Sequence, residues 1–232
     1  MDDKVFTFWE GQMPGYIQLC MKTWKFDYVL LNYSNLHEYT NLKLTDRLRS
    51  FSLPKIADVI RVHVLRNHGG YWLDTDTIMI SDELPKSNFM GYPDTREHTI
   101  GFLHTEPHAD MYRAWAKYQD SILSQSHTEH DACWNVFGNM FTDPYVKVHS
   151  DITISHIKPC WPETYMCCAG RSRHSKYVDL YFNNKYDLSN FHPTDMLMLH
   201  NSWTPGWYKR LSADDVLMKD CTLSNILREI LK

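Results

Sequence analysis

The chain has 232 residues, with 24 Lys and Arg against 28 Asp and Glu, and therefore a formal charge of −4. This length predicts one compact domain with a substantial core. No block of basic residues stands out, which excludes broad binding to a nucleic-acid backbone but leaves room for a small, local anion site. Eight Trp and fourteen Tyr suit core packing and ligand stacking equally well, so composition does not decide between the two uses.

The sequence shows neither a membrane span nor a secretion signal. No apolar run approaches the roughly 20 residues that a spanning helix needs, and the first four residues begin acidic, unlike a signal peptide. The six cysteines form no C-x-x-C pair, and the adjacent Cys167 and Cys168 make a mutual bridge awkward. We therefore expect reduced thiols in a cytoplasmic protein.

The first third of the chain alternates apolar strands with helices. Residues 5–9 and 27–33 read as strands on either side of a helix at 16–25, which follows a Gly- and Pro-containing break at 11–15. Pro54 can open a further helix over 55–67, which Gly69 and Gly70 end. A third strand at 71–73 then runs directly into Asp74-Thr75-Asp76.

The remainder has a weaker pattern. We expect strands at 88–92, 99–103, 152–157 and 196–199, a helix at 109–124, and a loop-like stretch at 159–190. Alternating strands and helices predict an α/β sandwich around a mostly parallel sheet. Ligands of such sheets gather at the carboxyl ends of the strands, where Asp74 and Asp76 fall.

Two carboxylates separated by one residue can bind the same ion if the chain turns there. Mg²⁺ or Mn²⁺ commonly combines one or two carboxylates with substrate phosphates, and neutralises a diphosphate leaving group. The tripeptide alone is a weak signal, because an ordinary solvated turn has the same composition. A Ca²⁺ loop of the EF-hand type is excluded, since Ile78 and Met79 replace the required oxygen ligand and Gly.

The preceding helix carries Asp58 and Arg61, which are three residues apart and hence on one face. Their neighbours are mostly apolar, so this helix is expected to be buried. Burying a carboxylate and a guanidinium costs free energy unless the two form an ion pair or bind a ligand. The residues alone leave two interpretations open: a structural ion pair, or a pair that faces a ligand.

Residues 57–76 follow the pattern A-D-x-x-R-x-x-x-L-x-x-x-G-G-x-[YW]-x-D-x-D. This segment resembles the glycosyltransferase family whose sugar-binding region contains a DXD motif. That family includes capsular polysaccharide synthesis transferases, the yeast initiating α-1,6-mannosyltransferase and, more distantly, the glucosylating domains of large clostridial toxins. The chain departs from the family at Trp72, where Tyr is usual, so the aromatic platform is kept while a different hydrogen-bond donor replaces the hydroxyl.

The resemblance extends to both ends of the chain. Residues 6–11 resemble the family's opening strand, which implies that Phe8 and Trp9 lie at the nucleotide base; core packing is the alternative for Trp9. Residues 196–203 resemble a late His…Ser-Trp element that closes over the diphosphate. This implies that His200 is a third metal ligand and that Ser202 and Trp203 donate hydrogen bonds to phosphate oxygens. A structural histidine and a packed tryptophan are the alternatives.

Between about 90 and 195 the resemblance is limited to general layout. Asp131 and Asn135 fall where related retaining transferases place a polar group beneath the sugar. His127 and His130 lie in a segment that lacks the H-E-x-x-H arrangement of zinc sites, so we interpret it as solvated.

The resemblance implies a GT-A fold, a Rossmann-like α/β/α sandwich over 1–232, with the donor and metal at about 1–105 and the acceptor side at about 106–232. It also implies a retaining, metal-dependent transfer of a hexose from a nucleotide sugar, of the UDP-sugar type, to a glycan acceptor. That acceptor would be lipid-linked and used at the cytoplasmic membrane face in capsule or surface polysaccharide synthesis.

The expected metal ligands are Asp74, Asp76 and His200 for Mn²⁺ or Mg²⁺, and the expected donor contacts include Asp58, Arg61, Trp72 and Thr75.

Two other functions use similar residues. A metal-dependent phosphohydrolase of a sugar phosphate would need more clustered carboxylates and His ligands than the sequence shows. A non-catalytic module for nucleotides or carbohydrates would not need both Asp74 and Asp76.

Overall fold

The computed structural model describes residues 3–91, 98–156, 171–185, 188 and 195–232. In this part of the chain, a six-stranded sheet has the order β2-β1-β3-β6-β5-β7. Its strands are β1 (Val5–Phe8), β2 (Tyr28–Leu31), β3 (Gly70–Leu73), β5 (Phe89–Gly91), β6 (His98–Thr105) and β7 (Ile154–His156). Strand β1 runs parallel to β2 and β3, and β5 runs parallel to β7, whereas β6 is antiparallel to both its neighbours. The predicted mostly parallel sheet is confirmed, with β6 as the reversed strand.

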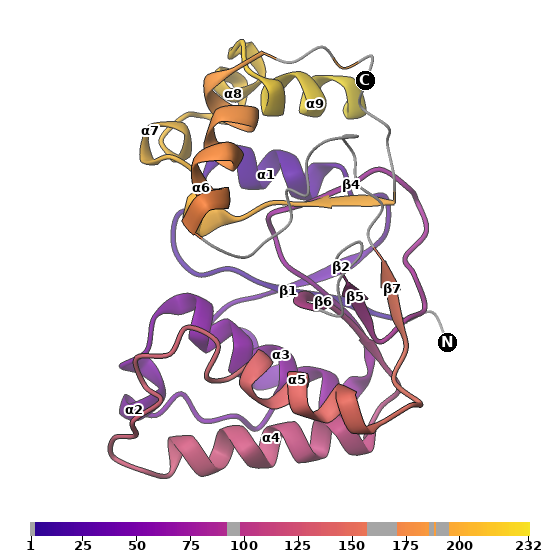
Figure 1. Cartoon of the computed structure of the whole chain (residues 1–232), viewed down its shortest axis with the longest axis vertical. Coiled ribbons are helices and arrows are strands. Elements are labelled where there is room, and N and C mark those ends of the chain that lie inside the picture. The colour runs from indigo at the N-terminus through magenta and orange to yellow at the C-terminus, as the bar shows by residue number, and fades with distance from the viewer. Residues whose placement is uncertain (1–2, 92–97, 157–170, 186–187, 189–194) are drawn as a thin grey trace.

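Helices lie on both sides of this sheet, as Figure 1 shows. The lower layer contains α3, α4 and α5, and the upper layer contains α1, α6, α8 and α9. The helices and short helical turns are α1 (Gly15–Lys22), η1 (Leu36–Glu38), α2 (Asp46–Arg49), α3 (Leu53–His68), α4 (Asp110–Leu123), α5 (Asn139–Val148), α6 (Arg171–Val178), η2 (Asp179–Asn183), η4 (Asn201–Trp203), α7 (Gly206–Lys209), α8 (Ala213–Met218) and α9 (Thr222–Ile230). The α/β/α sandwich predicted from the sequence is therefore present.

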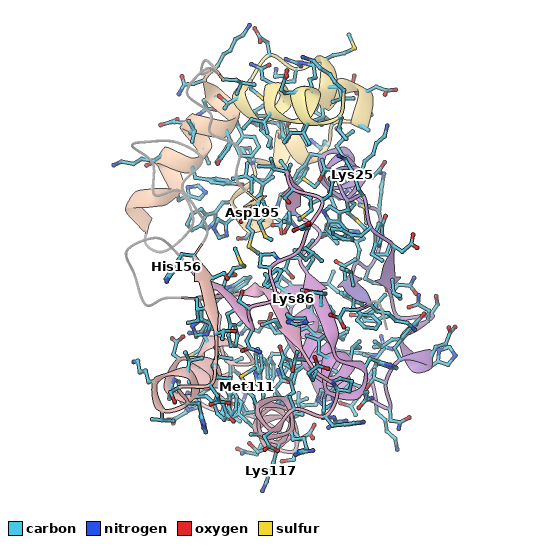
Figure 2. The ribbon with its side chains drawn as sticks, turned by 90° about the vertical axis from the view of Figure 1, so that its right-hand side faces the viewer. Lys25, Lys86, Met111, Lys117, His156 and Asp195 are labelled. Carbon is cyan, nitrogen blue, oxygen red and sulfur yellow. The ribbon has the colours of Figure 1, made fainter. Side chains whose placement is uncertain are left out.

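Figure 2 shows the same layers from the side. Met111 and Lys117, on α4, lie at the bottom of this view, Lys86 lies near mid-height, and Lys25 and Asp195 lie in the upper half. Two hydrophobic cores fill the space between the layers, one on each face of the sheet.

Strand β3 contributes alternate side chains to the two cores. Tyr71 and Leu73 belong to the core on the α1 side, while Trp72 belongs to the core on the α3 side. All four residues of β3 are buried. Its continuous apolar run is explained by this position, because both faces of a sheet covered by helices are removed from water.

A second, two-stranded sheet joins the C-terminal part of the chain to the end of β3. Strand β4 (Thr77–Met79) pairs antiparallel with β8 (Met196–Met198), with Ile78 opposite Leu197. In Figure 1 this pair lies between the main sheet and the upper helices. The pairing brings the segment that follows β8, 199–204, beside the D-x-D tripeptide.

The long elements agree with the sequence predictions. The helix predicted over 55–67 is α3, with Pro54 in its first turn and Gly69 at its end with a φ of 62°. The helix predicted over 109–124 is α4, and the strands predicted in the first third are β1, β2 and β3. Strand β4 was not predicted, because it is three residues long and follows the tripeptide directly.

One prediction was wrong in part. The stretch 159–190 was expected to be loop-like, yet 171–183 forms α6 and η2; the expectation for 159–170 falls outside the described residues. Cys20, Cys133 and Cys221 are free thiols, as expected, and the other three cysteines lie outside the described residues. Among the described helices, none combines the length and the apolar character that crossing a bilayer requires.

Gly70 is required where β3 passes β1. Its φ is 81°, and a Cβ there would lie against the carbonyl oxygen of Lys4, which accepts the N–H of Tyr71. Gly11 has a similar φ of 84° but nothing within 4 Å of an added Cβ. We expect Gly11→Ala to cost about 1–2 kcal/mol for the left-handed backbone alone. Gly70→Ala should cost more, because it adds a backbone clash. Urea unfolding of both variants measures the difference, and equal losses would contradict the close approach.

Candidate functional site

Arg61, on α3, is the centre of the candidate site. Its guanidinium lies 2.9 Å from Oδ1 of Asp58 and 3.2 Å from Oδ1 of Asp74, and it also donates to the carbonyl of Ile100 on β6. The group is 4% exposed and lies 5.1 Å from the ring centroid of Trp72. One buried cation therefore connects α3, the end of β3 and β6.

The local sequence explains this geometry. Asp58 and Arg61 are one helical turn apart and share a face, as predicted. Trp72 and Asp74 are two residues apart, and the indole Nε1 of Trp72 donates to Oδ1 of Asp74 at 2.8 Å. Because Trp72 is 1% exposed, its ring lies in the core and it reaches the site through Asp74 rather than through an open ring face.

Asp76 is held from the opposite layer. Its Oδ2 accepts the backbone N–H of Asn201 at 2.7 Å, and its carbonyl accepts the N–H of Leu199 at 3.0 Å. Thr75, between the two acids, is buried. The two carboxylates of the tripeptide are thus fixed by different parts of the fold, Asp74 by the α3 layer and Asp76 by the segment after β8.

The electrostatic balance of the site is negative. Burial raises the pKa of Asp58 to about 7, against a smaller lowering by Arg61 and with a further increase from Asp74. Burial also raises the pKa of Asp76 to about 7, again with a contribution from Asp74, while the N–H of Asn201 lowers it. Asp58 and Asp74 pair with the guanidinium of Arg61, whereas Asp76 accepts a backbone N–H, and a divalent cation with oxygen ligands would offset the negative charge of these acids.

His200 lies one residue before Asn201 but does not complete a preformed metal site. Burial lowers its pKa to about 4, so the imidazole is neutral at neutral pH, the form that binds metals. Its ring packs 4.6 Å from that of Trp203. Within the described ranges, no three His, Cys, Asp or Glu side chains are grouped so that they could hold an ion. Asp74 and Asp76 fit a site that substrate oxygens would complete.

The other residues predicted to bind the donor differ in how deeply they are buried. Phe8 is 8% exposed and belongs to the α3-side core, and Trp9 is half-buried against the α1-side core. Nε1 of Trp9 is enclosed and has no hydrogen-bond partner among the described residues. Ser202 is exposed, and Trp203 is half-buried. Ser202 is therefore open to solvent, whereas Trp9 and Trp203 are partly exposed and also pack against other side chains.

Asp131 is fully engaged by other side chains. Its carboxylate accepts from Arg47 at 2.6 Å and from Thr128 at 2.7 Å, and Nδ1 of His127 lies 2.9 Å from its Oδ2. The bond from Arg47 is the main reason that the pKa of Asp131 is strongly lowered. Asn135 is exposed four residues later. The contacts of Asp131 anchor this loop to α2 rather than place its carboxylate beside Asp74.

Sequence reasoning missed several residues of the site. The carbonyl of Ile100 carries no side-chain signal, and neighbouring Gly101 is revealed only by the fold, since a Cβ there would lie 2.8 Å from Oδ2 of Asp74. Asn201 lies in the segment that resembles the family, but its contact with Asp76 is made by its backbone N–H, which a sequence does not reveal.

Lys209, on α7, is close enough for Asp76 to raise its pKa, although burial lowers it more. Its position shortly after Ser202 and Trp203 could have indicated from the sequence that Lys209 lies near the site.

Solved structures with a similar architecture are glycosyltransferases. The glycosyltransferase GlyE of Streptococcus pneumoniae TIGR4 matches with a TM-score of 0.50 and 13% identity, covering 100% of this chain and 60% of GlyE. The PaToxG glycosyltransferase matches with a TM-score of 0.41 and 14% identity, covering 62% of this chain and 70% of that one. The chain thus spans less than two thirds of the length of GlyE. The likeness to GlyE shows a GT-A-type fold.

Residues 1–146 match the family described as capsular polysaccharide synthesis protein. This match covers more than half of the chain, so the chain belongs to that family. No curated protein matches it. The chain is therefore a member of a capsular polysaccharide synthesis family, and it has a GT-A-type fold.

The raised pKa of Asp58 predicts how stability depends on pH. The folded state has a pKa of about 7 for this group, and an unfolded Asp has about 3.9, so the folded state binds more protons between these values. Stability should therefore fall as pH rises through that window. In Asp58→Asn the group stays neutral, so the stability of the variant relative to wild type should rise between about pH 4 and pH 7 and stay level above pH 7.

Urea unfolding at several pH values measures this difference. Asp110→Asn, at a carboxylate that is 84% exposed on α4, is a control of the same chemistry. Parallel curves for Asp58→Asn and wild type would show that Asp58 ionises without a burial cost.

Proposed function

We propose that the chain transfers a hexose from a nucleotide-sugar donor to a glycan acceptor with retention of configuration, in capsule or surface polysaccharide synthesis. The observation that carries the proposal is the pair of Asp74 and Asp76, fixed side by side by two different layers of the fold. A donor of the UDP-sugar type and a lipid-linked acceptor at the cytoplasmic membrane face belong to the same proposal, which extends the family membership and the resemblance of residues 57–76.

In this proposal Asp74 and Asp76 would hold Mn²⁺ or Mg²⁺ together with oxygens of the donor diphosphate, and His200, which is not grouped with the two acids in the described structure, is the candidate for a further ligand. The ion would supply neutralisation of the charge that develops on the leaving diphosphate. Ser202 and Trp203 donate hydrogen bonds to its oxygens, and the ammonium of Lys209 adds positive charge near Asp76. Trp9 and Phe8 form the base side of the donor site.

Asp58 and Arg61 take different roles. The carboxylate of Asp58 is 14% exposed and can accept a sugar hydroxyl, whereas Arg61 is buried and already bonded to two carboxylates and a carbonyl. Arg61 is therefore assigned as the residue that orients Asp58 and Asp74. No side chain is assigned as a nucleophile; the acceptor hydroxyl attacks the anomeric carbon from the face of the leaving group and passes its proton to a diphosphate oxygen.

A thermal-shift screen of nucleotide sugars, with and without Mn²⁺, tests the proposal most broadly. A ligand that binds the folded state raises the melting temperature by mass action, so the preferred base and sugar can be identified. Transfer to an acceptor with the selected donor then separates a transferase from a phosphohydrolase, which would release the sugar without an acceptor, and from a module that only binds.

Asp74→Asn and Asp76→Asn should each reduce transfer about a hundredfold or more, because each removes a charge that the ion needs. Both variants should remain folded, since Asn preserves the shape of Asp. Asp82→Asn, at an acid that pairs with Lys25 and is 64% exposed, is the control and should retain activity. Near-normal turnover of either site variant at moderate Mn²⁺ would remove that residue from the metal site.

His200→Ala should weaken Mn²⁺-dependent donor binding more than it weakens metal-free nucleotide binding. His174→Ala is a matched control, since His174 also packs on Trp203, at 5.5 Å between ring centroids. Calorimetric titrations with and without Mn²⁺ give the two affinities. If both affinities fall equally, His200 contributes packing and not a ligand.

A further inference from the structure

Two buried tyrosine hydroxyls hold the segment that supports Asp76. Tyr16, on α1, donates to Oδ1 of Asn201 at 2.5 Å, and Tyr177, on α6, accepts the backbone N–H of His200 at 3.0 Å. Their side chains are 0% and 1% exposed. Helices that are far apart in the sequence therefore converge on two consecutive residues, and the second of these residues donates its own N–H to Asp76.

Thr204 closes the end of the segment. Its hydroxyl donates to the carbonyl of His200 at 3.2 Å. Thr204 is 4% exposed. The segment 200–204 is thus bonded to α6 at the backbone N–H of His200 and to α1 at the side-chain oxygen of Asn201, and it is closed internally at the carbonyl of His200.

This arrangement resists movement of the segment. Moving Asn201 away from Asp76 would leave the hydroxyl of Tyr16 buried without the acceptor that it has here, and a buried polar group without a partner is costly. The strand pair of β4 with β8 also fixes the chain immediately before the segment. A segment held in this way is a fixed wall of the site rather than a lid that closes on the substrate.

We propose that Tyr16 and Tyr177 are positioning residues that fix Asn201 against Asp76 and thereby set the affinity of the site for a divalent cation. This inference rests on the proposed function, because it assumes that Asp76 binds the ion. Neither residue needs to touch substrate. Partners of a metal ligand in the second layer typically change metal affinity by about ten- to a hundredfold when they are removed.

The variants Tyr16→Phe and Tyr177→Phe remove the hydroxyls and keep the rings in place. Tyr208→Phe is the matched control, since Tyr208 is equally buried and its hydroxyl bonds to Ser224 instead of to the segment 200–204. The first measurement is hydrogen exchange of the Asn201 amide in the metal-free protein. We expect exchange to accelerate about tenfold in both variants, because one hydrogen bond that closes the segment is lost in each, and to stay unchanged in Tyr208→Phe.

The second measurement is calorimetric titration with Mn²⁺ in the presence of UDP. The dissociation constant should rise about ten- to a hundredfold in Tyr16→Phe and Tyr177→Phe and remain at the wild-type value in Tyr208→Phe. Unchanged exchange at Asn201, or faster exchange with unaltered Mn²⁺ affinity, would overturn the inference. Failure of the wild-type protein to bind Mn²⁺ with UDP would instead contradict the proposed function, and the exchange data would still decide whether the tyrosines fix Asn201.

Discussion

The site depends on the buried guanidinium of Arg61, which pairs with the nearly buried Asp58 and with the partly exposed Asp74. Asp76 accepts the backbone N–H of Asn201 instead. Burial is the main reason that the pKa values of Asp58 and Asp76 are both raised to about 7, and the neighbouring Asp74 adds to both shifts. Buried acids of this kind are unfavourable for folding and are typical of a functional site. The need for added positive charge near Asp74 and Asp76 is the physical basis of the proposed metal site.

The surrounding fold fixes the positions of Asp74 and Asp76. Asp74 follows β3 on the side of α3, where the indole N–H of Trp72 holds it, and Asp76 faces the C-terminal segment across the β4–β8 pair. The two acids are therefore held by two different layers of the fold, one on each side of this tripeptide. In the upper layer, the hydroxyls of Tyr16 and Tyr177 bond to Asn201 and His200 and so hold the segment that supports Asp76.

Much of the lower half could be predicted from the sequence. The spacing of Asp58 and Arg61 on one helical face and the apolar strand that ends at Leu73 follow from local periodicity. The contact between Asp76 and Asn201 did not follow from it, because it depends on β4, which is too short to leave a periodic signal, and on a partner strand more than a hundred residues later. The helix that carries Tyr177 was read as a loop, because this stretch is polar and rich in basic residues. Roles played by backbone groups, such as the carbonyl of Ile100, leave no trace in a sequence of side chains.

The central claim is that a divalent cation binds between Asp74 and Asp76, beside the backbone of Asn201. Paramagnetic broadening by Mn²⁺, added with UDP to the isotope-labelled protein, tests it directly. Amide signals of Gly101, Asp76 and Asn201 should broaden first and in parallel, whereas those of α4 and α9 should stay sharp at the same Mn²⁺ concentration. Broadening centred elsewhere in the chain, or uniform weak broadening without a focus at these three amides, would contradict the account.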